Sequence, residues 1–300
     1  MLLTPEFLKQ LDPFYIRTNR SFRAKFRGER RSLNRGTGME FADYRVYEPG
    51  DDLRHVDWNI YARLDRLFVK LFHTDEALPL TLLIDNSRSM DFGSPTKLMC
   101  AKQVAAALGY IALADADSVT VYTCAERLFP VLPFVSSKSQ FPRLTSVLEA
   151  ITGSGRTRLT ECLKQFLMYQ RHAGRVIILS DFLDPNGYAD GFKLLSGGGF
   201  SISAIHIVSP EEIDPQIHLG DASADGDWLV EDAETGETKA VTINTETLAQ
   251  YRDQQQAFCE NLRRFCVDQG VGYAQLKSDI PIESFILEEL HRAGFIGRNR

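Results

Sequence analysis

The chain has 300 residues, of which 44% are hydrophobic, 25% charged and 10% aromatic. These proportions exclude a disordered, collagen-like or low-complexity protein. Its 34 basic and 40 acidic residues give a formal net charge of −6, which disfavours a chain that coats nucleic acid over its whole surface. Residues 17–35 depart from this average, because they hold eight basic side chains and one acidic side chain.

The first quarter of the sequence predicts an extension without a core of its own. Apolar residues within 5–27 follow a helical spacing. Residues 40–47 and 66–72 alternate as strands do, and a polar turn lies between them. We therefore expect residues 1–75 to form an N-terminal helix followed by a β-rich extension.

From residue 79 onward, short apolar runs alternate with helical segments. The runs have the unmixed composition of strands that are buried on both faces. Strands are expected at residues 80–85, 118–123, 175–181, 201–208 and 271–276. Helices are expected at residues 96–115, 138–150, 158–171, 187–196, 245–269 and 281–292. The alternation predicts an α/β fold over residues 76–300, with a mostly parallel sheet and helices on both faces. Residues 210–244 interrupt the series and predict a β-hairpin insert.

Cysteine usage and hydropathy bear on the compartment. The five cysteines form no C-x-x-C pair, which favours reduced thiols. The N-terminus lacks the apolar run of a signal peptide. We find no stretch that approaches the roughly 18 apolar residues of a membrane span. The sequence therefore predicts a soluble, cytoplasmic protein without a transmembrane segment.

Polar residues gather at the expected ends of two strands. Strand 80–85 ends in a D-x-S-x-S pattern that starts at Asp85, and strand 175–181 ends in Asp181. The loop 153–157, before a predicted helix, adds further hydroxyl groups. Ligands of doubly wound sheets bind beyond the carboxyl ends of the strands. Two carboxylates with several hydroxyls suit a hard divalent cation, and so few carboxylates favour Mg²⁺. Alternatively, the aspartate and serines only cap the following turn.

This pattern resembles the metal-ion-dependent adhesion site of von Willebrand factor A domains. The resemblance implies five metal ligands, some of them acting through water: Asp85, Ser87, Ser89, Thr157 and Asp181. It also implies Mg²⁺ or Mn²⁺ as the cofactor, with one coordination position filled by an acidic residue of a protein partner. Arg88, Arg156 and Arg158 add positive charge that would weaken cation binding or attract an acidic partner.

A longer motif resembles the signature of the bacterial domain-of-unknown-function family fifty-eight (DUF58). The motif comprises G-M-E-F-A-D-Y-R at 38–45, P-G-D-D-L-R-H-V-D-W-N at 49–59 and A-R at 62–63. The likeness runs from about residue 20 to the C-terminus and includes E-T-G-E at 234–237. In that family the signature precedes a von Willebrand A-like domain. Members are often encoded beside MoxR-type AAA+ ATPases, which implies such an ATPase as a partner.

The block 49–59 has two interpretations of its own. Its aspartates, with Asp57 among them, could pair with Arg45, Arg54 and Arg63 in a structural ion network. Alternatively, the block forms a recognition surface anchored by Trp58. We favour the ion network.

Together these inferences predict a non-enzymatic, Mg²⁺-dependent protein-interaction module that works with an AAA+ ATPase in assembling or remodelling a complex. One alternative is a nucleic-acid or anionic-surface binder that acts through the basic segment 17–35. Another is metal-assisted hydrolysis at the same site, although the sequence offers no general base beyond the ligands. An aspartyl-phosphate enzyme lacks a lysine partner in our interpretation.

Overall fold

The computed structural model describes residues 2–17, 40–48, 53, 56–73, 79–170, 174–215 and 226–298. Its contacts divide the chain into two units. The larger unit comprises residues 1–26 and 78–300, and the smaller unit comprises residues 27–77. This division differs from the expected boundary at residue 75, because the N-terminal segment belongs to the larger unit.

A six-stranded sheet with the order β11-β8-β7-β4-β5-β6 forms the centre of the larger unit. Its strands are β4 (Leu80–Asp85), β5 (Val119–Cys124), β6 (Leu128–Val135), β7 (Arg175–Ser180), β8 (Ser201–Val208) and β11 (Gly272–Lys277). All neighbours pair in parallel except β6, which runs antiparallel to β5. When the six strands are numbered in chain order, they stand in the order 3-2-1-4-5-6 from β6 to β11. This is the strand order of a doubly wound sheet. The predicted α/β fold with a mostly parallel sheet is confirmed.

The edge strand β6 was not among the predicted strands. It contains Pro130 and Pro133, and a proline cannot donate a hydrogen bond to a neighbouring strand. Such a segment resembles a loop in sequence, yet an edge strand tolerates proline. The side chains of Phe129 and Phe134 are exposed, so the alternation of buried apolar and exposed polar residues that marks a strand is not visible here.

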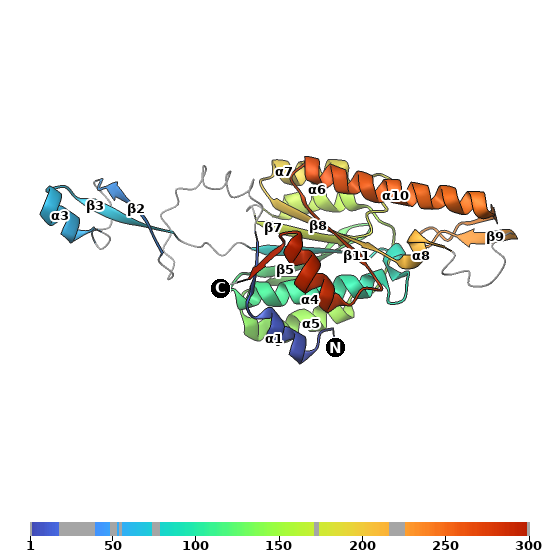
Figure 1. Ribbon diagram of the computed structural model, residues 1–300, viewed down its shortest axis with the longest axis horizontal. Coiled ribbons are helices and arrows are strands. Elements are labelled where there is room, and N and C mark those ends of the chain that lie inside the picture. The colour runs from blue at the N-terminus through green and yellow to red at the C-terminus, as the bar shows by residue number, and fades with distance from the viewer. Residues whose placement is uncertain are drawn as a thin grey trace. The chain divides into compact units, whose positions relative to one another are not determined.

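Helices cover both faces of this sheet (Figure 1). The first face carries α1 (Pro5–Leu11), α4 (Lys97–Ala114), α5 (Phe141–Ala150), α11 (Ile282–Ser284) and the π-helix η4 (Phe285–Leu290). The second face carries α6 (Leu159–Tyr169), α7 (Ala189–Gly197) and α10 (Thr245–Asp268). Two separate hydrophobic clusters result, one on each face. Short helical turns occur at η2 (Arg88–Asp91), η3 (Lys138–Gln140) and α8 (Pro210–Ile213).

Helix α4 is the most deeply buried helix element described on the first face. Thr96 caps it, because its hydroxyl accepts a hydrogen bond from the Met99 amide at 3.2 Å. By length and composition this helix of 18 residues could cross a membrane, contrary to our expectation that no segment would qualify. In the structure 83% of it is buried inside the protein, as in a core helix.

The N-terminal helix is shorter than predicted. Helix α1 ends at Leu11, and Phe14–Ile16 forms strand β1, which pairs antiparallel with β12 (Ile296–Arg298). Phe7 and Leu11 are buried in the same cluster as α4. The Arg175 guanidinium also donates to the Ile16 carbonyl at 2.8 Å. These contacts place the N-terminal segment in the larger unit.

The described part of the smaller unit contains an antiparallel pair of strands and a helix. The two predicted strands are present as β2 (Glu40–Val46) and β3 (Phe68–His73), and they pair antiparallel. Helix α3 (Trp58–Leu64) was not predicted. The buried Asp57 caps it, because one carboxylate oxygen accepts from the Asn59 amide at 2.9 Å. Asp57 therefore acts as a helix cap in this structure.

Two predictions for this unit remain open. Arg45 pairs with Glu48 at 3.2 Å, but Asp51, Asp52 and Arg54 of the proposed ion network lie outside the described residues. Trp58 is 59% exposed, so its role as a recognition anchor stays a prediction. The predicted basic segment 17–35 spans both units, and its residues 18–35 lie outside the described residues.

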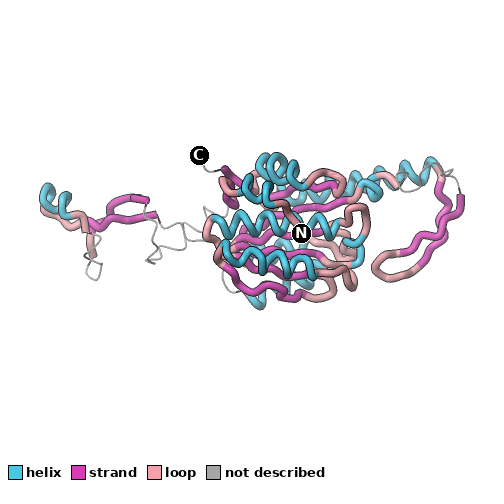
Figure 2. Tube along the Cα trace, turned by 90° about the horizontal axis from the view of Figure 1, so that it is seen from below, coloured by secondary structure: helices cyan, strands magenta, loops and turns pink. Residues whose placement is uncertain are grey.

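The predicted hairpin insert is present in the larger unit. Strands β9 (Gly226–Glu231) and β10 (Thr238–Ile243) pair antiparallel in full register. Figure 2 shows the two strands beside the body of the unit, with the turn between them directed toward its loops. Helix α10 follows β10 after the cap residue Asn244.

Candidate functional site

The candidate site lies where strands β4 and β7 end side by side. These two strands are parallel neighbours. The chain leaves β4 toward α4 on one face and leaves β7 toward α7 on the other. The connections of the two strands therefore run to opposite faces of the sheet. Where neighbouring connections diverge in this way, a crevice opens at the carboxyl edge of the sheet. Asp85 ends β4, and Asp181 directly follows β7.

Asp85 is fixed by hydrogen bonds to both of its carboxylate oxygens. The Ser87 amide donates to Oδ1 at 2.9 Å, and the Ser180 hydroxyl donates to Oδ2 at 2.6 Å. Burial and the neighbouring Asp181 carboxylate raise the pKa of Asp85 to about 7, although these hydrogen bonds oppose the rise. Each oxygen has a second lone pair, so Asp85 retains acceptor capacity toward the site.

Ser87 and Ser89 present their hydroxyls together. Their Oγ atoms are 3.0 Å apart, at the start of the turn η2. Mg²⁺ binds oxygen at about 2.0–2.1 Å in an octahedron, whose adjacent ligands are then about 2.8–3.0 Å apart. The spacing of the two hydroxyls fits that geometry.

The loop that carries Thr157 is tied to the loop after β4. The Ser154 amide donates to the Asn86 carbonyl at 2.7 Å, and the Arg88 amide donates to the Gly155 carbonyl at 3.2 Å. The Asn86 side-chain amide also donates to the Thr152 carbonyl at 3.1 Å. These bonds bring the loop 152–157 to the D-x-S-x-S segment.

Two glycines make this approach possible. A Cβ atom on Gly153 would lie 2.0 Å from a carboxylate oxygen of Asp91 in η2. Gly155 has a φ of +71°, in the left-handed region that favours glycine. A side chain at either position would disturb the path of the loop toward Thr157.

The buried Thr157 binds a carboxylate of the same chain. Its amide lies 3.2 and 3.1 Å from the two Glu234 carboxylate oxygens, and its hydroxyl donates to Oε1 at 2.5 Å. Glu234 lies in the turn between β9 and β10. Sequence reasoning did not assign this residue to the site, although the acidic turn at 231–237 was visible.

Asp181 belongs to a buried ion cluster that the sequence did not reveal. The fully buried Lys97 ammonium donates to Asp181 Oδ2 at 2.7 Å and also pairs with Glu212 of α8. Burial lowers the pKa of Lys97, but the Asp181 and Glu212 charges outweigh it and raise that pKa overall. Asp181 Oδ1 accepts from the Leu183 amide at 3.1 Å.

The backbone after Asp181 takes an uncommon conformation. Phe182 has a φ of 58°, which is in the left-handed region. Its amide donates to the Ser180 hydroxyl at 2.8 Å, and its side chain is buried. Non-glycine residues in this region occur preferentially at functional sites, where the surrounding structure holds them.

The five predicted ligands therefore lie along one edge of the larger unit. Among the described residues, no group of three or more His, Cys, Asp and Glu side chains is arranged to hold a metal. A cation here would depend on the serine and threonine hydroxyls together with two carboxylates, a donor set that suits Mg²⁺. Arg88, Arg156 and Arg158 are exposed, so solvent screens their repulsion of a cation more than that of the buried Lys97 ammonium beside Asp181.

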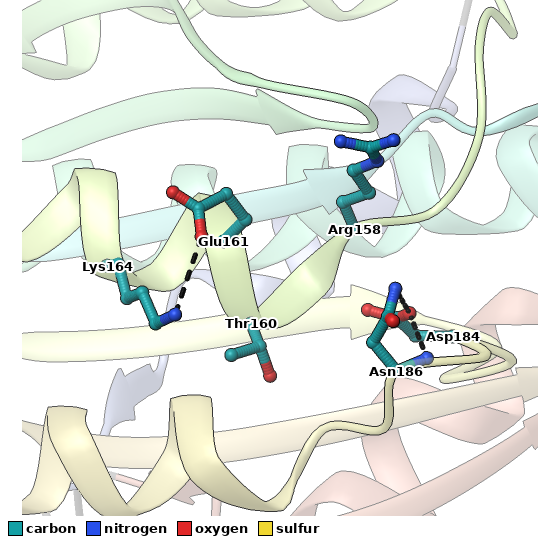
Figure 3. Close-up of a pocket in the computed structure, with 6 residues that line it drawn as sticks. All are labelled: Arg158, Thr160, Glu161, Lys164, Asp184 and Asn186. Atoms are coloured by element: carbon teal, nitrogen blue, oxygen red, sulfur yellow. Dashed lines mark hydrogen bonds and ion pairs between the residues drawn. The ribbon is translucent and has the colours of Figure 1, made fainter.

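A hollow of about 470 Å³ lies beside the site (Figure 3). Its lining residues are Arg158, Thr160, Glu161, Lys164, Asp184 and Asn186. Figure 3 shows Lys164 paired with Glu161 on α6, and Asn186 beside Asp184. All six lining residues are of polar or charged types, whereas small-molecule sites are lined mainly by apolar side chains.

The sequence matches a known family. The family described as "Protein of unknown function DUF58" matches residues 43–260. The chain belongs to the DUF58 family. The matched range is narrower than the resemblance predicted at both ends. It still includes all five predicted ligands of this DUF58 protein, as well as Glu234.

Three similar proteins extend this comparison. The uncharacterized protein Rv1480 of Mycobacterium tuberculosis is 25% identical over 222 residues, covering 72% of this chain and 68% of its own. The solved structure of the conserved hypothetical protein BatB from Bacteroides thetaiotaomicron is 18% identical, with a TM-score of 0.44. The match covers 72% of this chain and 98% of the BatB chain. A von Willebrand factor type A structure from Catenulispora acidiphila is 18% identical, with a TM-score of 0.37. The match covers 75% of this chain and 51% of that one.

Proposed function

We propose that this DUF58 protein is a non-enzymatic, metal-dependent protein-interaction module. Its Mg²⁺ or Mn²⁺ ligands would be Asp85, Ser87, Ser89, Thr157 and Asp181. When bound, the ion would supply a positive charge and a coordination position for an acidic side chain. The observation that carries the proposal is the shared edge, where two buried carboxylates lie beside converging hydroxyls.

The residues of the chain divide the work of such a site. Ser180 orients the Asp85 carboxylate through the 2.6 Å hydrogen bond. Lys97 holds the Asp181 carboxylate through an ion pair of 2.7 Å. The Thr157 amide and hydroxyl bind a carboxylate already, which supports an acidic residue as the group to be recognised.

Two buried titratable side chains near the site, Lys97 and His206, do not fit the role of a general base. Lys97 is held in a buried ion pair. Burial lowers the pKa of His206 to about 4, and its ring bonds the Tyr273 hydroxyl at 2.9 Å. A general base needs an accessible group that reaches the substrate proton. Neither side chain meets that requirement.

We propose a MoxR-type AAA+ ATPase as the partner and complex assembly or remodelling as the setting. We also propose a cytoplasmic location, which the five free cysteines support. Four of these cysteines are buried in the structure.

The test is retention of a purified MoxR-type ATPase from the same organism by the immobilised full chain. We expect retention in Mg²⁺ but not in EDTA, and loss of retention in Asp85→Ala. Thr152→Ala is the matched control, because it alters an exposed hydroxyl of the adjoining loop outside the ligand set. Retention that is equal in EDTA and in Asp85→Ala would refute the metal-dependent mechanism.

A further inference from the structure

The turn between β9 and β10 brings acidic side chains to the candidate site. Residues 231–237 contain four acids: Glu231, Asp232, Glu234 and Glu237. Only Glu234 among these four is half-buried, whereas the other three are exposed. The turn therefore directs one carboxylate inward.

The inward carboxylate binds the site as a separate acidic ligand would. Glu234 accepts from both the amide and the hydroxyl of Thr157, at distances of 2.5 to 3.2 Å. Hydrogen bonds to an ionised acceptor are stronger than those between neutral groups. Because Thr157 is one of the proposed metal ligands, a carboxylate at this point lies next to the ion position.

The turn is ordered in a conformation that presents Glu234. Asp232 Oδ1 accepts from the amides of Glu234 and Thr235, both at 2.8 Å. These hydrogen bonds lower the pKa of Asp232, and the charge of Arg156 lowers it further. Gly236 has a φ of +71°, which closes the turn. An ordered turn loses little entropy when its carboxylate binds.

Arg156 gives the approach its charge preference. It directly precedes Thr157, and its charge acts on Asp232. Arg158 lies on the other side of Thr157 and is also exposed. The surface around Thr157 therefore favours a ligand that carries a second acid near the first, as the D-x-E sequence at 232–234 does.

We propose that the β9–β10 turn is a tethered occupant of the place where an acidic partner binds. The partner would present a similar acidic turn and would have to displace Glu234. This inference rests on the proposed function, because it concerns the same site. A tethered ligand competes at a high effective concentration. A partner can then bind only those molecules in which the turn is detached, so its apparent affinity falls to that fraction of the intrinsic affinity.

Amide hydrogen exchange of the full chain in EDTA tests the contact itself. Glu234→Ala removes the bound carboxylate, and Glu237→Ala is the control. In the part of the chain that the structure describes, the Glu237 side chain makes no hydrogen bond or ion pair. We expect the Thr157 amide to exchange about ten-fold faster in Glu234→Ala than in the wild type or the control. Equal exchange in all three proteins would overturn the proposal.

A labelled cyclic peptide that carries residues 231–237 tests competition in Mg²⁺. We expect Glu234→Ala to bind this probe about ten-fold more tightly than the wild type and Glu237→Ala. Equal binding by all three proteins would overturn the tethered occupant but leave the proposed function standing. Binding by none of them, with the exchange difference present, would refute acid recognition and the inference that rests on it.

Discussion

His206 shows how one buried residue makes the stability of the larger unit depend on pH. The side chain is 1% exposed, and the rings of Phe182 and Phe258 lie 5.9 Å from its own ring. Burial lowers its pKa to about 4, while the Asp181 and Lys97 charges act in opposite directions. The folded protein therefore keeps this imidazole neutral.

The pH dependence follows from the two states of His206. In the unfolded chain its pKa is about 6.5, so between about pH 6.5 and 4 the unfolded state binds a proton that the folded state does not. Stability is therefore lost as the pH falls through this window, by up to about 3 kcal/mol. Asp85 acts with the opposite sign, because burial raises its pKa.

We predict that His206→Gln loses less stability than the wild type between pH 7 and 4. The amide does not titrate and can still bond the Tyr273 hydroxyl. Urea unfolding in EDTA at several pH values measures the difference. Both proteins contain Asp85, so its contribution to the pH dependence cancels in the comparison. Parallel pH profiles for the two proteins would show that His206 is not buried in its neutral form.

At the scale of elements, one ammonium group joins α4, the end of β7 and α8. Lys97 is the first residue of α4 and pairs with Asp181 and Glu212. Loss of one member of a buried ion cluster leaves its partners charged and without compensation. Because Asp181 is one of the proposed ligands, its position in the candidate site depends on this cluster.

We predict that Lys97→Met destabilises the larger unit by about 3–5 kcal/mol. Lys193→Met is the matched control, because Lys193 is exposed and lies 3.8 Å from Asp190. An exposed pair contributes at most about 1 kcal/mol. Chemical denaturation compares the variants. Similar losses in both would mean that the Lys97 cluster contributes no more than a surface pair.

Local sequence signals account for most of the elements. The buried strands β4, β7 and β8 were predictable, because an unmixed apolar run is visible in the sequence. Helix α1 was predicted too long, although Pro13 lacks the amide that would continue it. Helix α3 was missed, although Asp57 before it is a favoured cap residue.

The site was predictable only where its residues follow a strand. Asp85 and Asp181 follow β4 and β7, and the topology of the sheet brings such ends together. Lys97 lies 84 positions from Asp181, and Glu234 lies 77 positions from Thr157. Nothing local in a sequence pairs residues so far apart, because their contact arises from tertiary packing.

At the scale of the molecule, the candidate site belongs to the larger unit alone. The family match over residues 43–260 extends into the smaller unit as well. Strand β11, the N-terminal segment and β12 lie outside that range. The part shared with the family therefore contains the candidate ligands and the acidic turn, whereas the flanking segments complete the sheet and the core.

The most direct test of the account is a calorimetric titration of the full chain with Mg²⁺, and with Mn²⁺ as a second ion. We predict one binding site in the wild type and in Thr152→Ala, and at least about ten-fold weaker binding in Asp85→Ala. Circular dichroism would establish that each variant is folded. Absence of binding in a folded wild type, or equal binding by Asp85→Ala, would contradict a metal site at this edge of the sheet.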